Sequence, residues 1–121
     1  MKIESVIPIL CSDDVTRSIT YYTEVLGFKE NRSWDEAPTF GGVVDGTTSI
    51  FFCRGDQGRK GTWPAINVDN VDKYYEAIKA KGAEILSLPD TKPWSMREML
   101  VKDPDGHILR AHRAQHQLRL N

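Results

Sequence analysis

Residue types that commonly carry catalysis or crosslinks are scarce in this chain of 121 residues. Its two cysteines, Cys11 and Cys53, form no C-x-x-C motif and predict reduced, buried thiols instead of a disulfide framework. Its three histidines, His107, His112 and His116, all lie near the C-terminal end, and no Ser/His/Asp set stands out. The G-x-S-x-G, P-loop and H-E-x-x-H motifs are absent, which argues against the enzyme classes that they mark.

The chain also has no large excess of positive or negative charge and no long apolar run. Sixteen basic and 17 acidic residues give a net charge of −1, which argues against electrostatic nucleic-acid binding. No apolar run approaches the roughly 20 residues of a membrane span, and the first residues lack the apolar stretch of a signal peptide. With 40% hydrophobic and 27% charged residues, the composition is that of a globular protein. We expect one cytoplasmic domain, 1–121, with no nucleic-acid or membrane partner.

What the sequence does contain is an internal repeat. Ile7–Gly27 and Trp63–Gly82 read as two copies of one unit. At an offset of 56 they share the pairs Pro8/Pro64, Asp13/Asp69, Val15/Val71, Ile19/Tyr75 and Tyr22/Ile78. Further on, Gly27 matches Gly82, and Asp45-Gly46 matches Asp105-Gly106. A duplicated unit of this size can build a site between its halves.

Each copy predicts a strand, a helix and three further strands. The openings, Ile3–Leu10 and Trp63–Val68, are rich in β-branched residues, and Asp13 and Asp69 are suited to cap the helices that follow. Each helix carries an apolar stripe at i, i+4 and i+7 and ends at Gly27 or Gly82. The later strands are expected at Phe28–Ser33, Thr39–Val44 and Thr47–Cys53, and at Glu84–Leu88, Glu98–Lys102 and His107–His112.

The remaining segments are the link between the two copies, the C-terminal tail and an extra segment in the second copy. We expect the two units at 1–54 and 62–112, joined by an exposed, glycine-rich link at 54–61 and followed by a polar tail at 113–121. The second copy has extra residues in Leu88–Trp94, whose two prolines predict a stiff loop. Trp94 in this loop is expected either to contact a ligand or to cover the edge of the core.

The ordered set of motifs resembles the glyoxalase / bleomycin-resistance / extradiol-dioxygenase (vicinal oxygen chelate) superfamily. Pro8-Ile9-Leu10, Tyr21-Tyr22 and Leu26-Gly27-Phe28 are similar to its first unit, Val68–Asp72 and Lys81-Gly82 to its second, and Asp103–His107 to the turn before its last strand. The resemblance covers nearly the whole chain. It implies an α+β fold in which two βαβββ repeats form a curled mixed sheet, an incomplete barrel with a cleft, paired in a homodimer.

The same resemblance locates the positions where metal-dependent members carry His or Glu. Counted from the matched motifs, these positions hold Ile7, Ile50 or Phe52, Trp63 and Arg110. Arginine offers no lone pair and the other side chains are not ligands, so we expect no metal and no cofactor. A zinc site from His107, His112 and Glu98 is a weaker alternative, because His107 should alternate to the opposite strand face from His112.

Apolar residues at these positions predict a pocket for a flat or greasy organic molecule. Trp63, Trp94 and Phe52 offer stacking faces, Arg110 and Glu98 offer orienting groups, and Phe40, Ile7, Ile50 and His112 complete the candidate ligand-binding set. Ile7, Ile50 and Phe52 would also suit the core. Glu98 with His112 is an alternative acid/base pair, because both side chains are able to face the cleft.

The nearest resemblance is to the metal-free bleomycin-resistance type, carried by Val6–Leu10, Phe40–Val44 and Lys92–Pro104. Those proteins sequester a large cationic glycopeptide in two clefts of a dimer. Here only Asp35-Glu36 and Glu98 are obvious acidic candidates, which speaks against bleomycin itself. We predict a small-molecule sequestering protein of the antibiotic-resistance kind. The alternatives are a divergent metal-dependent lyase, isomerase or dioxygenase, and a structural or regulatory partner protein with a closed cleft.

Overall fold

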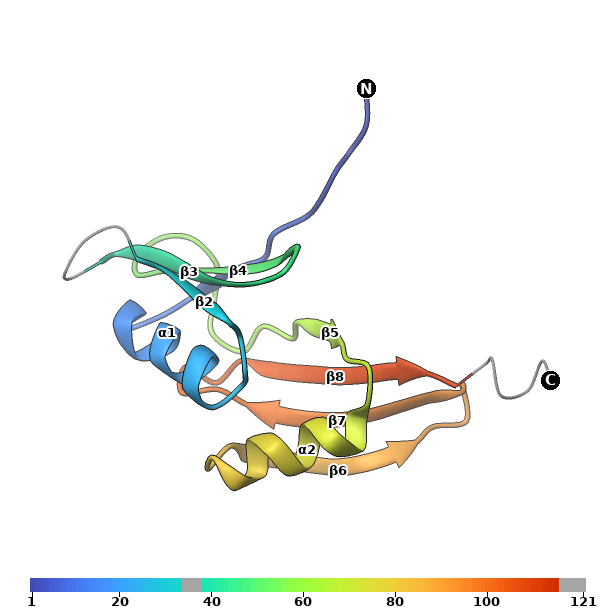
Figure 1. The fold of residues 1–121 in the computed structure, drawn as a ribbon. Helices are drawn as coiled ribbons and strands as arrows, with labels where there is room; N and C mark the ends of the chain where they lie inside the picture. Colours follow the sequence, from blue (N-terminus) through green and yellow to red (C-terminus); the bar gives the residue numbers. More distant parts are fainter. Residues whose placement is uncertain (34–37, 116–121) are drawn as a thin grey trace.

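Two four-stranded sheets make up most of the computed structural model, which describes residues 1–33 and 38–115 (Figure 1). The first sheet, in the order β1-β4-β3-β2, consists of β1 (Ile9–Cys11), β2 (Glu30–Ser33), β3 (Phe40–Asp45) and β4 (Thr48–Cys53). The second, in the order β5-β8-β7-β6, consists of β5 (Ala65–Asn67), β6 (Glu84–Thr91), β7 (Met96–Lys102) and β8 (Ile108–Ala114). Helix α1 (Val15–Glu24) follows β1 and α2 (Val71–Ala80) follows β5, which confirms two βαβββ units in an α+β fold.

The helices begin at matched caps, one residue later than predicted. The Asp14 carboxylate accepts a hydrogen bond from the backbone N–H of Arg17 at 3.0 Å, and the Asn70 side chain accepts one from Lys73 at 3.0 Å. The prediction of Asp13 and Asp69 as caps is wrong, because the capping side chain belongs to the residue immediately before the first helical one. Gly27 and Gly82 both have positive φ, as predicted. Gly82 directly follows the C-cap of α2, whereas α1 ends earlier than predicted, at Glu24, with its cap at Val25.

One apolar core joins both units. Val15, Ile19 and Tyr22 of α1 are buried, as are Val71 and Ile78 of α2, so the predicted stripes face inward. The sheets contribute alternate residues to the same cluster: Leu10, Val43, Ile50, Phe52, Met99, Val101, Leu109 and Ala111. Because side chains alternate along a strand, each sheet keeps one face against this core and turns the other away from it. We call the second face of each sheet its open face.

Several predicted strand boundaries are wrong. Strand β1 begins at Ile9 instead of Ile3, because only Ile9–Cys11 lies in register with β4, and the chain before it runs away from the body (Figure 1). Only the end of Leu88–Trp94 is a loop, since β6 continues to Thr91 through two register shifts against β7 and a turn follows from Lys92. Pro89 is tolerated there because β6 is an edge strand. Strand β8 runs on to Ala114, and residues 116–121 lie outside the described part.

The connection between the units is exposed, as predicted, from Arg54 to Trp63. Gly58 packs on the free edge of β1, where a Cβ would lie 3.0 Å from the Ile9 carbonyl oxygen. Within the described residues, no helix is long and apolar enough to cross a membrane.

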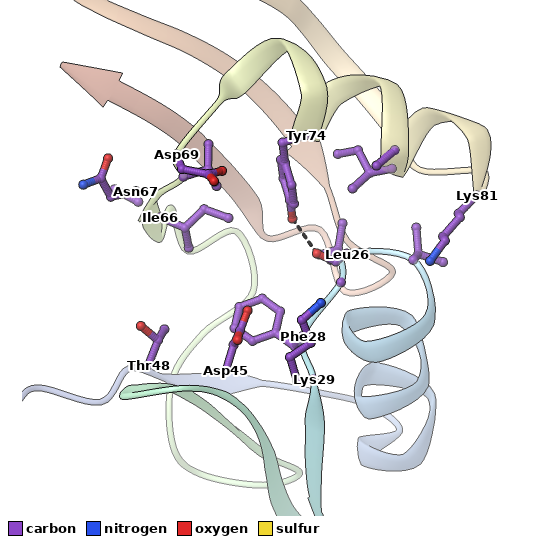
Figure 2. A pocket seen from close by; sticks show the side chains of 16 residues that line it. Leu26, Phe28, Lys29, Asp45, Thr48, Ile66, Asn67, Asp69, Tyr74 and Lys81 are labelled. Atoms are coloured by element: carbon purple, nitrogen blue, oxygen red, sulfur yellow. Dashed lines mark hydrogen bonds between the residues drawn. The ribbon is translucent and has the colours of Figure 1, made fainter. Parts of the chain in front are cut away.

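Tyr74 of α2 ties the second unit to the first. Its hydroxyl donates a hydrogen bond to the Leu26 carbonyl oxygen at 2.7 Å (Figure 2). Burial raises the pKa of Tyr74 well above its usual value of 10.0, and burial also raises the pKa of Tyr22 in α1. A tyrosine whose pKa is raised in the folded state stabilises the fold fully below the unfolded pKa. That contribution is lost as the pH rises above 10.

Replacing Tyr74 with phenylalanine is therefore expected to flatten the alkaline loss of stability. Above about pH 10, the free energy of unfolding of the parent should fall more steeply with pH than that of Tyr74→Phe. The difference in slope should approach about 1.4 kcal/mol per pH unit, the value for one proton. Urea unfolding at a series of alkaline pH values measures both slopes, and equal slopes would contradict the buried, neutral state of this hydroxyl.

Candidate functional site

Five of the predicted site residues lie together on the open face of the second sheet. Met99, Val101, Leu109 and Ala111 face the core, so Glu98 on β7 and Arg110 and His112 on β8 face the other way. Glu98 and His112 are direct register partners. Trp63 joins this face because the parallel ladder continues upstream of β5, with the Arg110 N–H donating to the Pro64 carbonyl oxygen at 2.9 Å.

Glu98 is the centre of the group, with only 5% of its surface exposed. The indole Nε1 of Trp94 donates a hydrogen bond to Glu98 Oε2 at 3.1 Å, and Arg110 Nε lies 3.8 Å from Oε1. One buried carboxylate thus holds both an aromatic ring and a cation in place. The Arg110 side chain remains 44% exposed, and Trp63 and Trp94 are 54% and 61% exposed, so all three present contact area to solvent.

The turn that carries Trp94 has an unusual backbone. Ser95 has a φ of 65°, a positive value that non-glycine residues rarely adopt. The turn is closed by the Lys92 N–H donating to the Met96 carbonyl oxygen at 2.8 Å, and the Gln115 N–H donates to the Ser95 carbonyl oxygen at 2.8 Å. These bonds fix the position of Trp94 over Glu98, so the extra segment of the second copy does bring an aromatic ring to the open face.

Ile50 and Phe52 do not share this face. They are 2% and 1% exposed, and the Phe52 ring packs edge-on against Tyr22 at a centroid distance of 4.8 Å. Both fill the core, which is the alternative role predicted for them from their apolar side chains. Alternation instead puts Phe51 on the open face of the first sheet, over Gly42, where a Cβ would lie 2.6 Å from Phe51 Cδ1.

The two remaining candidates belong to the first unit. Phe40 stacks edge-on against Phe51 at a centroid distance of 5.5 Å, so it lies on the open face of the first sheet. Ile7 precedes β1 and is 39% exposed. The predicted set is therefore divided between the two units, with the larger group on the second sheet. Asp35 and Glu36 lie outside the described residues.

The alternative zinc site does not assemble. His107 is fully buried between the units, where its Nδ1 accepts from the Thr62 N–H at 3.1 Å. Its Nε2 lies 2.7 Å from the Cys11 carbonyl oxygen, and this bond assigns the proton to Nε2. With both nitrogens engaged, His107 cannot join Glu98 and His112. The part of the chain that is described, which omits His116, holds no group of three or more potential ligands for a metal ion.

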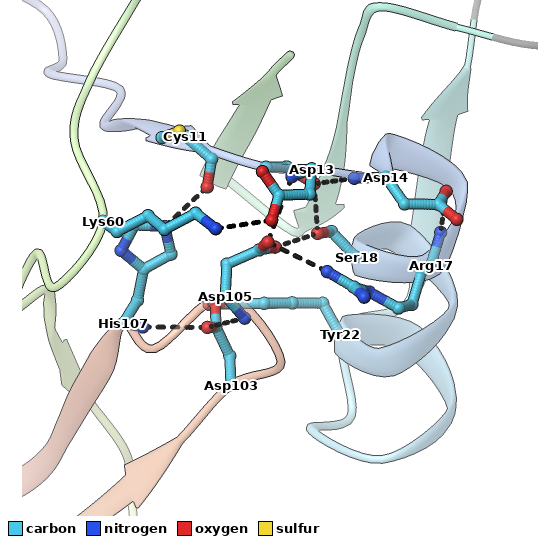
Figure 3. Close-up of polar contacts among 11 residues, drawn as sticks. Cys11, Asp13, Asp14, Arg17, Ser18, Tyr22, Lys60, Asp103, Asp105 and His107 are labelled. Atoms are coloured by element: carbon cyan, nitrogen blue, oxygen red, sulfur yellow. Dashed lines mark hydrogen bonds and ion pairs between the residues drawn. The ribbon is translucent and has the colours of Figure 1, made fainter. Parts of the chain in front are cut away.

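His107 belongs to a polar junction between the units (Figure 3). Asp105 accepts hydrogen bonds from the Asp13 N–H, the Arg17 guanidinium and the Ser18 hydroxyl, at 2.9 to 3.0 Å. Asp103 accepts from the Tyr22 hydroxyl at 2.7 Å and from the backbone N–H groups of Asp105 and His107, each at 2.9 Å. Every carboxylate in the junction is engaged within the protein, so the cluster holds α1 against the second unit instead of presenting groups to a ligand.

A cavity of about 760 Å³ lies between the units and was not predicted from the sequence (Figure 2). Leu26, Phe28, Ile66 and Tyr74 form part of its wall, and its other lining residues include Lys29, Asp45, Asn67 and Lys81. No predicted site residue lines it. We place the candidate site on the open face of the second sheet, because aromatic rings, a cation and a buried carboxylate contact one another there.

Comparison with known proteins shows which family this chain is similar to. A family model described as "Glyoxalase/Bleomycin resistance protein/Dioxygenase superfamily" matches residues 3–110. A protein of Vibrio parahaemolyticus serotype O3:K6 (strain RIMD 2210633), named "Probable lactoylglutathione lyase", is 29% identical over 110 residues, which are 79% of this chain and 80% of that protein.

Solved structures share the fold at lower identity. The crystal structure of TioX from Micromonospora sp. ML1 is 21% identical with a TM-score of 0.79, covering 92% of this chain and 98% of that one. A superfamily member from Sphaerobacter thermophilus DSM 20745 is 23% identical with a TM-score of 0.76, at the same coverages of 92% and 98%. With the family model matched over most of its length, this chain belongs to the Glyoxalase/Bleomycin resistance protein/Dioxygenase superfamily.

Proposed function

We propose that this protein is a metal-independent binder that sequesters a flat organic molecule, a drug or an aromatic metabolite, on the open face of the second sheet. The observation that carries the proposal is the Trp94–Glu98–Arg110 group, with Trp63 on the same face. Exposed indole rings stack on aromatic ligands. The outer guanidinium N–H groups of Arg110 suit an anionic or carbonyl oxygen. Because Glu98 already holds both partners, their side chains would lose little conformational entropy on binding.

A second copy of the chain completes the site in this proposal. The open face of one four-stranded sheet leaves a flat ligand uncovered on one side. The open face of the first sheet, with Phe40 and Phe51, offers a complementary aromatic surface. In a homodimer, the first sheet of one protomer would cover the second sheet of its partner and form two equivalent clefts. Analytical ultracentrifugation is expected to give twice the mass of one chain, and a monomer at binding concentrations would contradict this arrangement.

Tryptophan emission provides the direct test of binding. A panel of planar drugs, aromatic metabolites and the anionic probe 8-anilinonaphthalene-1-sulfonate should contain molecules that quench Trp63 and Trp94 and raise the melting temperature. A ligand at 100 times its dissociation constant stabilises the folded state by about 2.7 kcal/mol. A panel that changes neither emission nor melting temperature would remove the support for sequestration.

The relative named "Probable lactoylglutathione lyase" favours a second candidate, a metal-dependent lyase. The side chains on the open face fit this candidate poorly, because Trp63 and Arg110 are not ligands and the Glu98 carboxylate is engaged by two partners. Elemental analysis of protein purified without chelators separates the two functions. We expect far less than one metal ion per chain, whereas stoichiometric, tightly held nickel, zinc, iron or manganese would overturn the binder in favour of the enzyme.

A further inference from the structure

The two cysteines are neighbours on adjacent strands. Cys11 of β1 and Cys53 of β4 are direct register partners in the parallel pair of the first sheet. Their neighbours Leu10 and Phe52 face the core, so both thiols point to the open face. Hydrogen-bonded strands lie about 4.8 Å apart, and disulfides join residues whose Cα atoms are roughly 4.4–6.8 Å apart. This proximity could not be predicted from the sequence, because 41 residues separate the two cysteines.

The two thiols have different access to solvent. Cys53 is 7% exposed but lies outside the core cluster, whereas Cys11 is partly exposed, and neither is in a disulfide. The link passes close to Cys11, since a Cβ on Gly58 would lie 3.0 Å from the Cys11 backbone nitrogen. This link carries Arg54, Arg59 and Lys60 against Asp56. Lys60 is paired with Asp13, which leaves a net positive charge that would attract an anionic reagent.

We propose that Cys11 and Cys53 form a redox-active dithiol that closes to an intrachain disulfide by exchange with a small anionic disulfide such as oxidised glutathione. The Cys11 thiolate attacks one sulfur of the reagent, which forms a mixed disulfide and releases one glutathione thiolate. Cys53 then loses its proton and attacks the Cys11 sulfur, which releases the second glutathione. Two protein thiols are oxidised, and one reagent disulfide is reduced to two thiols.

The reaction is reversible by thiol exchange, because a reducing thiol can attack the closed disulfide and regenerate both cysteines. The register of β1 and β4 already places the two Cα atoms within the range of a disulfide, so closure needs the two thiols to turn toward each other. Closing the bond would also join the end of β1 to the end of β4, next to Phe40, the register partner of Cys53.

The test uses the folded, full-length chain in glutathione buffers of increasing oxidised fraction. Free thiols are then alkylated under denaturing conditions and the products are weighed by mass spectrometry. We expect a product that has lost two hydrogen atoms, has no alkylated cysteine and runs as a single chain on a non-reducing gel. Dithiothreitol should restore both thiols.

Single variants provide the controls. Cys11→Ser and Cys53→Ser should form at most one glutathione adduct and never the closed product. Circular dichroism checks that each variant is folded. Three outcomes would overturn the proposal. Both thiols of the parent remain free in the most oxidising buffer, a stable glutathione adduct accumulates without closing, or a disulfide forms between two chains.

Discussion

Replacing Asp105 with alanine is expected to lower the free energy of unfolding by about 3 kcal/mol. This carboxylate is 5% exposed and accepts hydrogen bonds from three groups at the start of α1, in the other unit. Removing one partner of a buried, hydrogen-bonded charge pair costs roughly 3–5 kcal/mol. We place the value at the lower end because the Arg17 side chain is 45% exposed and can return to water. A whole domain is stable by only about 5–15 kcal/mol, so this is a large effect.

Two further variants test whether the loss of stability comes from the buried hydrogen bonds of Asp105 or from removing a negative charge in this region. Asp105→Asn keeps an acceptor of the same size and should lose clearly less stability than Asp105→Ala. Asp13→Ala removes an exposed carboxylate whose side chain pairs with Lys60 at the surface, and its backbone N–H can still donate to Asp105. It should leave the urea midpoint almost unchanged. Equal losses for Asp13→Ala and Asp105→Ala would contradict the assignment of Asp105 as the residue that joins the units.

This junction could not have been found in the sequence, whereas the repeat could. The repeat depends on local patterns: apolar stripes at helical spacing, glycines after the helices and Asp-Gly turns between strands. Such patterns determine local backbone structure, and the observed βαβββ order follows them. Ser18 and Asp105 are 87 residues apart, and their contact arises only when the two units dock. Neither segment alone indicates which residue of the other segment it will contact.

The site was partly predictable for a related reason. On β8, buried Leu109 and Ala111 alternate with Arg110 and His112, so the face of each residue can be read from the sequence. The faces of the β4 residues cannot be predicted in this way, because the strand contains consecutive apolar residues: Ile50, Phe51, Phe52 and Cys53. Either register would bury an apolar set, and only the packing of Phe52 on Tyr22 decides between them.

Replacing Arg110 with methionine should have the largest effect on binding of an anionic aromatic molecule. Methionine keeps an apolar side chain of similar length and removes the charged donor. A hydrogen bond to a charged group contributes about 1.5–3 kcal/mol, and each 1.4 kcal/mol is tenfold in affinity. The dissociation constant of 8-anilinonaphthalene-1-sulfonate, measured by fluorescence titration, should therefore rise roughly 10- to 100-fold.

Arg113 supplies a matched control on the same strand. It is exposed and, three residues further along β8, alternates to the face opposite Arg110. Arg113→Met makes the same change in net charge, so any long-range electrostatic effect on the probe should be the same in both variants. If the probe binds through Arg110 itself, Arg113→Met should keep nearly the parent affinity while Arg110→Met loses it. Equal losses in both variants would show that only the overall charge matters, and no loss in Arg110→Met would remove the open face as the binding site.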